Sequence, residues 1–133
     1  MSDTEHARKW ARFGRQASQQ GDHTSAVFAL ERAVELGENS TDAWIALGIA
    51  RAHQRQTESA IQALQHAVQL DPTSVTAWCI IGELGLELKQ YSLSLDAFKH
   101  CFELDPKGAN PHGARAKALV RKTYKSLQSD SPK

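Results

Sequence analysis

Histidine and cysteine are the residues of this 133-residue chain that are best suited to chemistry. The six histidines could act as metal ligands or general bases, and His66 and His100 lie 34 residues apart. Neither has a carboxylate or cysteine at i+3 or i+4 beyond what ordinary helix patterning gives, so the signal for a metal site is weak. The chain contains no His-Glu-x-x-His, no glycine-rich phosphate loop and no Gly-x-Ser-x-Gly. We therefore predict no catalytic residue, no metal and no cofactor, so this chain is not expected to be an enzyme.

The two cysteines, Cys79 and Cys101, are too few for a disulfide scaffold and are not clustered as in a zinc site. Cys101 is expected to be a small buried residue. Cys79 is expected to be an ordinary thiol, because no neighbouring cation lowers its pKa. A cytoplasmic location is the default expectation, since the polar start has no secretory signal and no apolar run reaches the roughly 18 residues of a membrane span.

The formal net charge of +1 hides an uneven distribution. Residues 1–15 carry +2, residues 16–106 carry −7 and residues 107–133 carry +6. Basic runs can contact nucleic acid or acidic lipid. The basic tail lacks interleaved aromatic residues apart from Tyr124, so nucleic acid is not an expected partner.

A repeat of 34 residues organises the chain. Columns of identical residues recur at this spacing, namely Trp10, Trp44 and Trp78, and Gly14, Gly48 and Gly82. Leu70-Asp71-Pro72 and Leu104-Asp105-Pro106 end two repeats, and Leu36-Gly37-Glu38 ends the other. Two helical patterns per repeat predict helical hairpins at 7–40, 41–74 and 75–108. They follow a flexible start at 1–6 and precede a capping helix at 109–128 and a disordered tail at 129–133.

These columns resemble the tetratricopeptide repeat (TPR) family. The middle repeat matches best, with Trp44, Leu47, Gly48, Ala60, Leu64, Ala67 and Pro72 in the family's columns. Departures stand at position 11 (Ala17, Arg51 and Gly85), at position 20 of the third repeat (Ser94) and at position 32 of the first (Glu38). The resemblance implies an all-α, right-handed solenoid of three repeats with a C-terminal capping helix.

The resemblance also implies a concave groove lined by the first helix of each repeat. Its predicted peptide-binding residues are Arg8, Ala11, Arg12, Arg15, Ile45, Ile49, His53, Cys79, Glu83 and Leu86. One end of this set is basic, its centre is apolar and its far end is acidic. Co-chaperone members of the family hold a peptide carboxylate with Lys, Asn and Arg at positions 2, 5, 6 and 9. Positions 5 and 9 here are mostly apolar or acidic, so we predict no binding of that type.

We therefore expect a non-catalytic interaction module or adaptor that binds a peptide or amphipathic helix of another protein in its groove. Two alternatives remain open. The chain could be a small chaperone of a secreted or aggregation-prone client. It could also be a self-associating scaffold, in which the basic tail of one copy meets the acidic middle of another. The groove itself could be filled by residues 1–6, by the tail or by a second copy.

Overall fold

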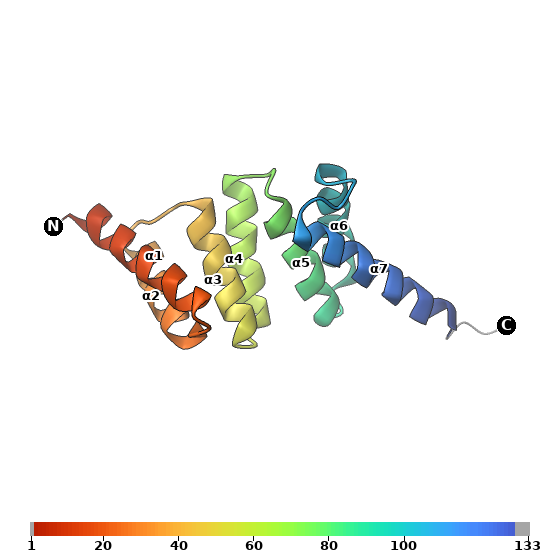
Figure 1. Cartoon of the computed structure of the whole chain (residues 1–133), viewed down its shortest axis with the longest axis horizontal. Coiled ribbons are helices and arrows are strands. Elements are labelled where there is room, and N and C mark those ends of the chain that lie inside the picture. Colours follow the sequence, from red (N-terminus) through yellow and green to blue (C-terminus); the bar gives the residue numbers. More distant parts are fainter. Residues whose placement is uncertain (1, 130–133) are drawn as a thin grey trace. The chain divides into compact units, whose positions relative to one another are not determined.

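The computed structural model describes residues 2–129, apart from a few side chains near the C-terminal end, and these residues form seven α-helices and no strand. The helices are α1 (Asp3–Gln19), α2 (His23–Glu35), α3 (Thr41–His53), α4 (Thr57–Leu70), α5 (Val75–Glu87), α6 (Tyr91–Leu104) and α7 (Pro111–Ser129) (Figure 1). They form two compact units, Met1–Pro72 (unit 1) and Thr73–Lys133 (unit 2). The predicted all-α TPR fold is confirmed. None of the described helices is both long and apolar enough to cross a membrane.

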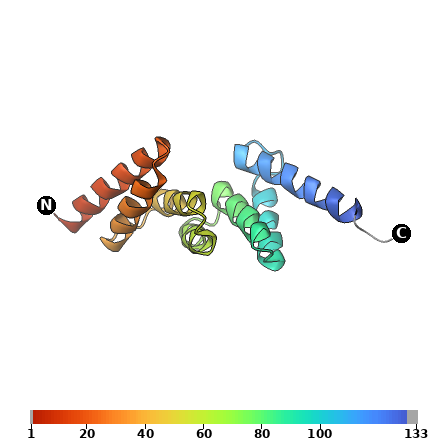
Figure 2. The same cartoon turned by 90° about the horizontal axis from the view of Figure 1, so that it is seen from below.

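Unit 1 contains two helical hairpins, α1–α2 and α3–α4, and α3 also packs against α2 (Figure 2). A serine precedes the first helix of each repeat and accepts a hydrogen bond from the backbone N–H three residues on. Ser2 plays this role for α1, so helix α1 begins at Asp3. The start predicted to be flexible at 1–6 is thus helical from Asp3 onward. The predicted disordered tail begins within α7, at Ser129, and its residues 130–133 lie outside the described part of the chain.

Glycine at position 8 of each repeat lets the two helices of a hairpin approach closely. A Cβ on Gly48 would lie 2.7 Å from Leu64 Cγ, and one on Gly82 would lie 2.6 Å from Phe98 Cδ1. Real Cβ atoms do not approach other atoms so closely. The bulky residue at position 24 therefore fits against the first helix only because position 8 has no side chain.

Two departures from the family pattern compensate for each other in the third repeat. Ser94 replaces the usual alanine and is buried, and its hydroxyl donates a hydrogen bond to the Gly82 carbonyl at 2.8 Å. A Cβ on Gly85 would lie only 3.3 Å from the backbone of Ser94. Glycine at position 11 thus makes room for the turn of α6 that carries this serine.

The first repeat ends differently because Glu38 stands where the other repeats have proline. Gly37 has a φ of 101°, which favours glycine. The N–H of Glu38 donates to the Ala33 carbonyl at 2.9 Å, and that of Gly37 to the Val34 carbonyl at 3.2 Å. This is a Schellman motif, and it needs a backbone N–H that proline lacks.

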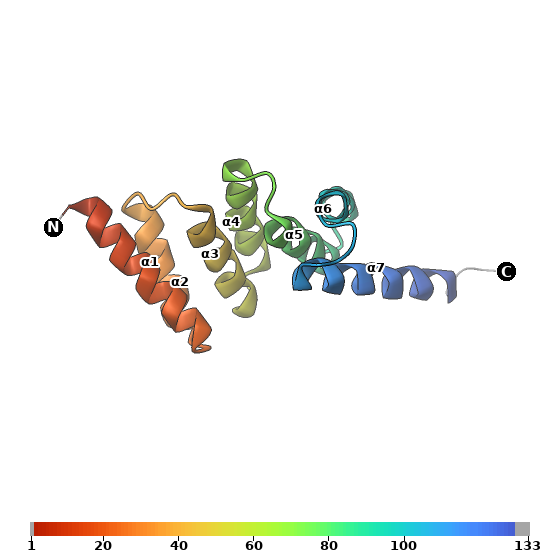
Figure 3. The same ribbon diagram turned by 45° about the horizontal axis from the view of Figure 1, so that its top comes forward.

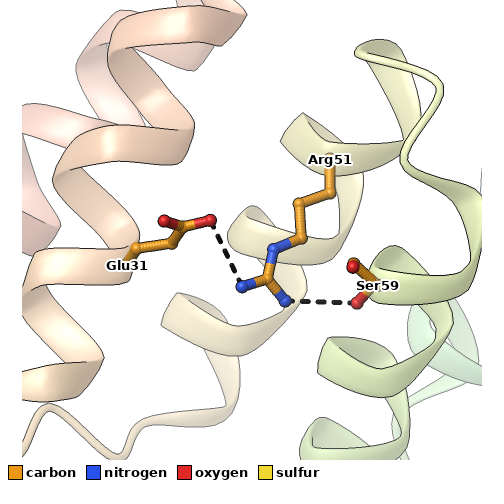
Figure 4. A network of polar contacts seen from close by, with 3 residues as sticks. All are labelled: Glu31, Arg51 and Ser59. Atoms are coloured by element: carbon orange, nitrogen blue, oxygen red, sulfur yellow. Dashed lines mark hydrogen bonds and ion pairs between the residues drawn. The ribbon is translucent and has the colours of Figure 1, made fainter.

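Arg51, the departure at position 11 of the second repeat, joins three helices of unit 1 (Figure 4). One guanidinium nitrogen donates to the Ser59 carbonyl at 3.2 Å, and another lies 3.4 Å from the Glu31 carboxylate. The Arg51 side chain is mostly buried. This arginine therefore ties α3 both to its own hairpin partner α4 and to α2 of the preceding repeat.

The two cysteines form a disulfide that links α5 to α6. Both residues are fully buried, beside Phe98 and Ala116. The expectation that Cys79 is a free, groove-lining thiol was wrong, because its side chain points toward α6 and not toward a ligand. The corresponding residues of the first repeat, Ala11 and Ala33, are also buried, so the disulfide occupies a helix contact that small residues fill elsewhere.

Helix α7 completes the core of unit 2. Its residues Ala116, Leu119 and Val120 pack on the cluster that contains the disulfide. Before the helix, the buried Asp105 carboxylate accepts hydrogen bonds from the N–H groups of Ala109 and Asn110. A Cβ on Gly113 would lie 2.3 Å from this carboxylate. Asp105 and Gly113 thus fix how the chain turns from α6 into α7.

Removing the disulfide should lower the stability of unit 2. The double variant Cys79→Ala, Cys101→Ala has alanine at both positions, as the first repeat does. Its unfolding free energy should fall by about 3 kcal/mol, because the disulfide closes a loop spanning 22 residues in the unfolded chain. Urea unfolding followed by circular dichroism measures the loss. A reductant should destabilise the wild-type chain but leave the double variant unchanged; equal effects on both would contradict the disulfide.

Candidate partner-binding face

The first helices of unit 1 present a basic face beside two isoleucines. Arg8, Arg12 and Arg15 are exposed and lie on one side of α1, at i, i+4 and i+7. Among the ion pairs of the described residues, none involves these three arginines. Ile45 and Ile49 are half-buried and lie one turn apart on α3, which packs against α1. We call these five residues the α1–α3 face.

Ala11 does not belong to this face. It is buried, together with Ala7, Gly14 and Ala17, along one stripe of α1. Its predicted role in peptide binding was therefore wrong. The helical spacing of these small residues was visible in the sequence and could have identified the stripe as a packing surface.

His53 is exposed, but its ring is already in contact with another residue. The His53 ring stacks on the His23 ring at the start of α2, with centroids 4.0 Å apart and planes 7° apart. Next to it, the Gln54 side chain donates to the Thr24 hydroxyl at 2.7 Å. His53 thus takes part in the contact between α2 and α3, and only its outer surface is left for a ligand.

Two further histidines stack on tryptophans, and these contacts were not predicted from the sequence. His66 lies on Trp44 at 4.2 Å and His100 lies on Trp78 at 4.1 Å, each nearly parallel. The pairs occupy positions 4 and 26 of the second and third repeats, so the shared period of 34 was the available signal. The tryptophans therefore anchor histidines within their own hairpins, and the described residues contain no group of three or more potential metal ligands.

In unit 2, the chain's own α7 lies against the predicted groove residues of α5. The Arg115 guanidinium lies 3.4 Å from the Glu83 carboxylate. Leu86 faces an open pocket of about 530 Å³ between α5 and α7, which Leu119 and Lys122 also line. Figure 3 shows α7 passing beside α5 and extending beyond it. Of the three groove residues predicted here, Cys79 is in the disulfide, and Glu83 and Leu86 face α7.

Burial raises the pKa of Glu83. Desolvation raises the pKa of this carboxyl, and the neighbouring Glu87 acts in the same direction, whereas Arg115 opposes the shift. One Glu83 oxygen is buried without a hydrogen-bond partner. The ion pair with Arg115 therefore offsets little of the cost of burying the Glu83 carboxylate, because the arginine itself is largely exposed to solvent.

Comparison with known proteins places the chain in a family. Tetratricopeptide repeat profiles match residues 12–75 and 75–107. The chain belongs to the tetratricopeptide repeat family, and it is a protein-interaction module of that class. No curated protein sequence matches it significantly.

Solved structures share this fold at low sequence identity. The TPR domain of Arabidopsis OM64 is 20% identical, with a TM-score of 0.80 over 92% of this chain and 99% of that one. The Sgt2 TPR domain from Aspergillus fumigatus is 18% identical, with a TM-score of 0.79 over 96% and 85%. The first TPR of Spaghetti (RPAP3), bound to the HSP90 peptide SRMEEVD, is 16% identical, with a TM-score of 0.77 over 96% and 99%. These similarities establish the fold alone.

The raised pKa of Glu83 predicts a pH-dependent variant. A carboxyl whose pKa is raised by folding stabilises the native state below its ordinary value of 4.5, and this contribution disappears as pH rises through the raised pKa. Glu83→Gln removes the buried charge, so it should increase the unfolding free energy at neutral pH more than at pH 4.5. Urea unfolding at both pH values tests this.

The exposed Glu103 supplies the matched control for this experiment. Glu103→Gln should change stability little, and by a similar amount at both pH values. A Glu83→Gln effect that does not depend on pH would contradict the assignment.

Proposed function

We propose that the α1–α3 face binds an extended segment or amphipathic helix of a partner protein. Apolar residues of the partner would contact Ile45 and Ile49, and acidic residues of the partner would lie against the arginines of α1. The observation that carries this proposal is the juxtaposition of two accessible isoleucines with three arginines that have no ion pair among the described residues. The protein would act as an adaptor.

The two halves of the face contribute in different ways. Removing apolar surface from water supplies affinity, at about 25 cal/mol per Å². The arginines supply orientation and faster association with acidic segments, and this contribution weakens with salt. A partner that lacks either an apolar or an acidic part would use only half of the face.

A selection experiment tests this assignment. Peptides selected from a random display library on the wild-type chain should combine apolar residues with Asp or Glu. Ile49→Glu should weaken their binding by at least about tenfold, because it places a carboxylate in the apolar part of the face and beside an acidic ligand. Fluorescence anisotropy measures the affinity.

Leu70→Glu is the matched control, because Leu70 is also a partly exposed apolar residue of unit 1 but lies at the end of α4. This variant should bind the selected peptides as the wild type does. Equal loss in both variants, or none in Ile49→Glu while circular dichroism shows a native fold, would contradict the proposal.

The chaperone-tail mode is not favoured for this chain. Spaghetti is similar in fold and is described with the peptide SRMEEVD. In co-chaperones of this family, the positions of Ile45 and Ile49 hold polar residues that bind a peptide carboxylate. Here both are apolar, and Ala11, the equivalent of Ile45 in the first repeat, is buried. A peptide carboxylate brought to these positions would lose its water without gaining enough hydrogen bonds.

The peptide SRMEEVD is therefore a useful probe. We expect weak binding that is the same with a free and with an amidated C-terminus, because any attraction would come from its glutamates and the arginines of α1. Isothermal titration of both forms measures this. A clear preference for the free carboxylate would show that a carboxylate clamp exists.

The chaperone alternative remains a proposal without a specific supporting observation. The cytoplasmic location also stays a prediction, and it must accommodate the Cys79–Cys101 disulfide, because disulfides are rare in reducing compartments. Thiol labelling of the protein from its native source, followed by mass spectrometry, would determine whether the bond forms in the cell.

A further inference from the structure

An aromatic cluster is exposed on the first hairpin, α1–α2. Trp10 makes edge-to-face contacts with Phe13 and Phe28, at centroid distances of 6.4 and 5.8 Å. Phe13 is 53% exposed and Phe28 is 65% exposed. The equivalents of Phe13 in the other repeats, Leu47 and Ile81, are buried. We call Trp10, Phe13 and Phe28 the α1 edge.

A second apolar surface lies on α6 of unit 2. Leu95 is 73% exposed and Tyr91, one turn before it, is 61% exposed. The equivalents of Leu95 in the other repeats, Val27 and Ile61, are buried. Helix α7 packs on Phe98 and Phe102, farther along α6. We call Tyr91 and Leu95 the α6 edge.

The contact between α2 and α3 shows what these two edges are built to meet. In that contact, Val27 and Leu30 of α2 pack in one cluster with Leu47 and Ala50 of α3, and Trp44 packs against it. Leu95 occupies the same repeat position as Val27. Trp10 and Phe13 occupy the same positions as Trp44 and Leu47. The α6 edge thus corresponds to the Val27 part of the α2 side of such a contact, whereas Phe98, the equivalent of Leu30, already packs with Ala116 of α7. The α1 edge corresponds to the α3 side.

We propose that the α6 edge of one copy docks on the α1 edge of a second copy, so that the chain associates head to tail. Each edge alone exposes large apolar side chains that a repeat protein normally covers with a neighbouring repeat or a polar cap. A second copy provides the matching half of a repeat-to-repeat contact, because each chain carries both halves. The contact is heterologous, since two different surfaces meet.

Polar positions of the two edges agree with this arrangement. The α2–α3 contact includes a hydrogen bond from Gln54 to Thr24. The equivalent positions hold Gln20, which is exposed at the end of α1, and Ser92, which is exposed on α6. Glutamine and serine can form the same type of bond between copies. The Arg51–Glu31 pair has no equivalent between copies, because the corresponding positions hold Ala17 and Lys99. The contact between two copies should therefore be weaker than the α2–α3 contact within unit 1.

Two charge substitutions test the proposal separately and together. Phe13→Glu blocks the α1 edge and Leu95→Glu blocks the α6 edge, and both residues are exposed, so the fold should tolerate them. Sedimentation velocity over a concentration series should show association of the wild-type chain and monomers for each variant alone. An equimolar mixture of the variants should form a 1:1 dimer, because each supplies the edge that the other lacks.

Other outcomes would overturn head-to-tail docking. A mixture that stays monomeric would exclude the contact between these edges. Association that survives in Leu95→Glu but is lost in Phe13→Glu would indicate a symmetric contact between two α1 edges. A wild-type chain that stays monomeric over the whole series would refute association altogether.

A second variant pair and a control guard against effects on folding. Phe28→Glu and Tyr91→Glu should reproduce the pattern of Phe13→Glu and Leu95→Glu, including dimer formation on mixing. Leu70→Glu lies on neither edge and should associate as the wild type does. Because Ile45 and Ile49 lie outside both edges, Ile49→Glu should also leave association unchanged, which separates this inference from the proposed peptide binding.

Discussion

The close approach of paired helices at glycine is the constraint on which each hairpin depends. Gly14, Gly48 and Gly82 let Leu30, Leu64 and Phe98 reach the backbone of the first helix, where any Cβ would collide. The large side chain at position 24 and the missing one at position 8 therefore form a single packing solution, repeated three times. This contact sets how the two helices of a hairpin lie against each other, and thereby which of their side chains stay exposed.

The sequence predicted the features that repeat and missed those that occur once. The period of 34, the paired helices and the small-residue columns all follow from packing that every repeat must satisfy. The Cys79–Cys101 disulfide is unique to the third repeat, and the two cysteines separately looked like ordinary buried or surface residues. The place of α7 also could not be read from its amphipathic pattern, because the pattern shows which side is apolar but not which helix it meets.

The predicted groove residues fall into different roles in the two units. In unit 1, Ile45, Ile49 and the arginines of α1 keep accessible surface. In unit 2, the equivalent positions are used for structure, through the disulfide and the pair between Glu83 and Arg115. The family pattern defines columns by the hairpin alone, so it assigned both sets to a ligand. Ala11 shows the same limit, since its burial is determined by the neighbouring small residues of α1.

The different neighbours of the three tryptophans have an optical consequence. Trp10 lies against phenylalanine rings, whereas Trp44 and Trp78 each lie flat on an imidazole. Because the emission of an indole depends on the groups that touch it, Trp10 should be distinguishable from Trp44 and Trp78. Trp44 belongs to unit 1 and Trp78 to unit 2. The protein therefore carries a native fluorophore in each unit, and single-tryptophan variants could follow the folding of the two units separately without an added dye.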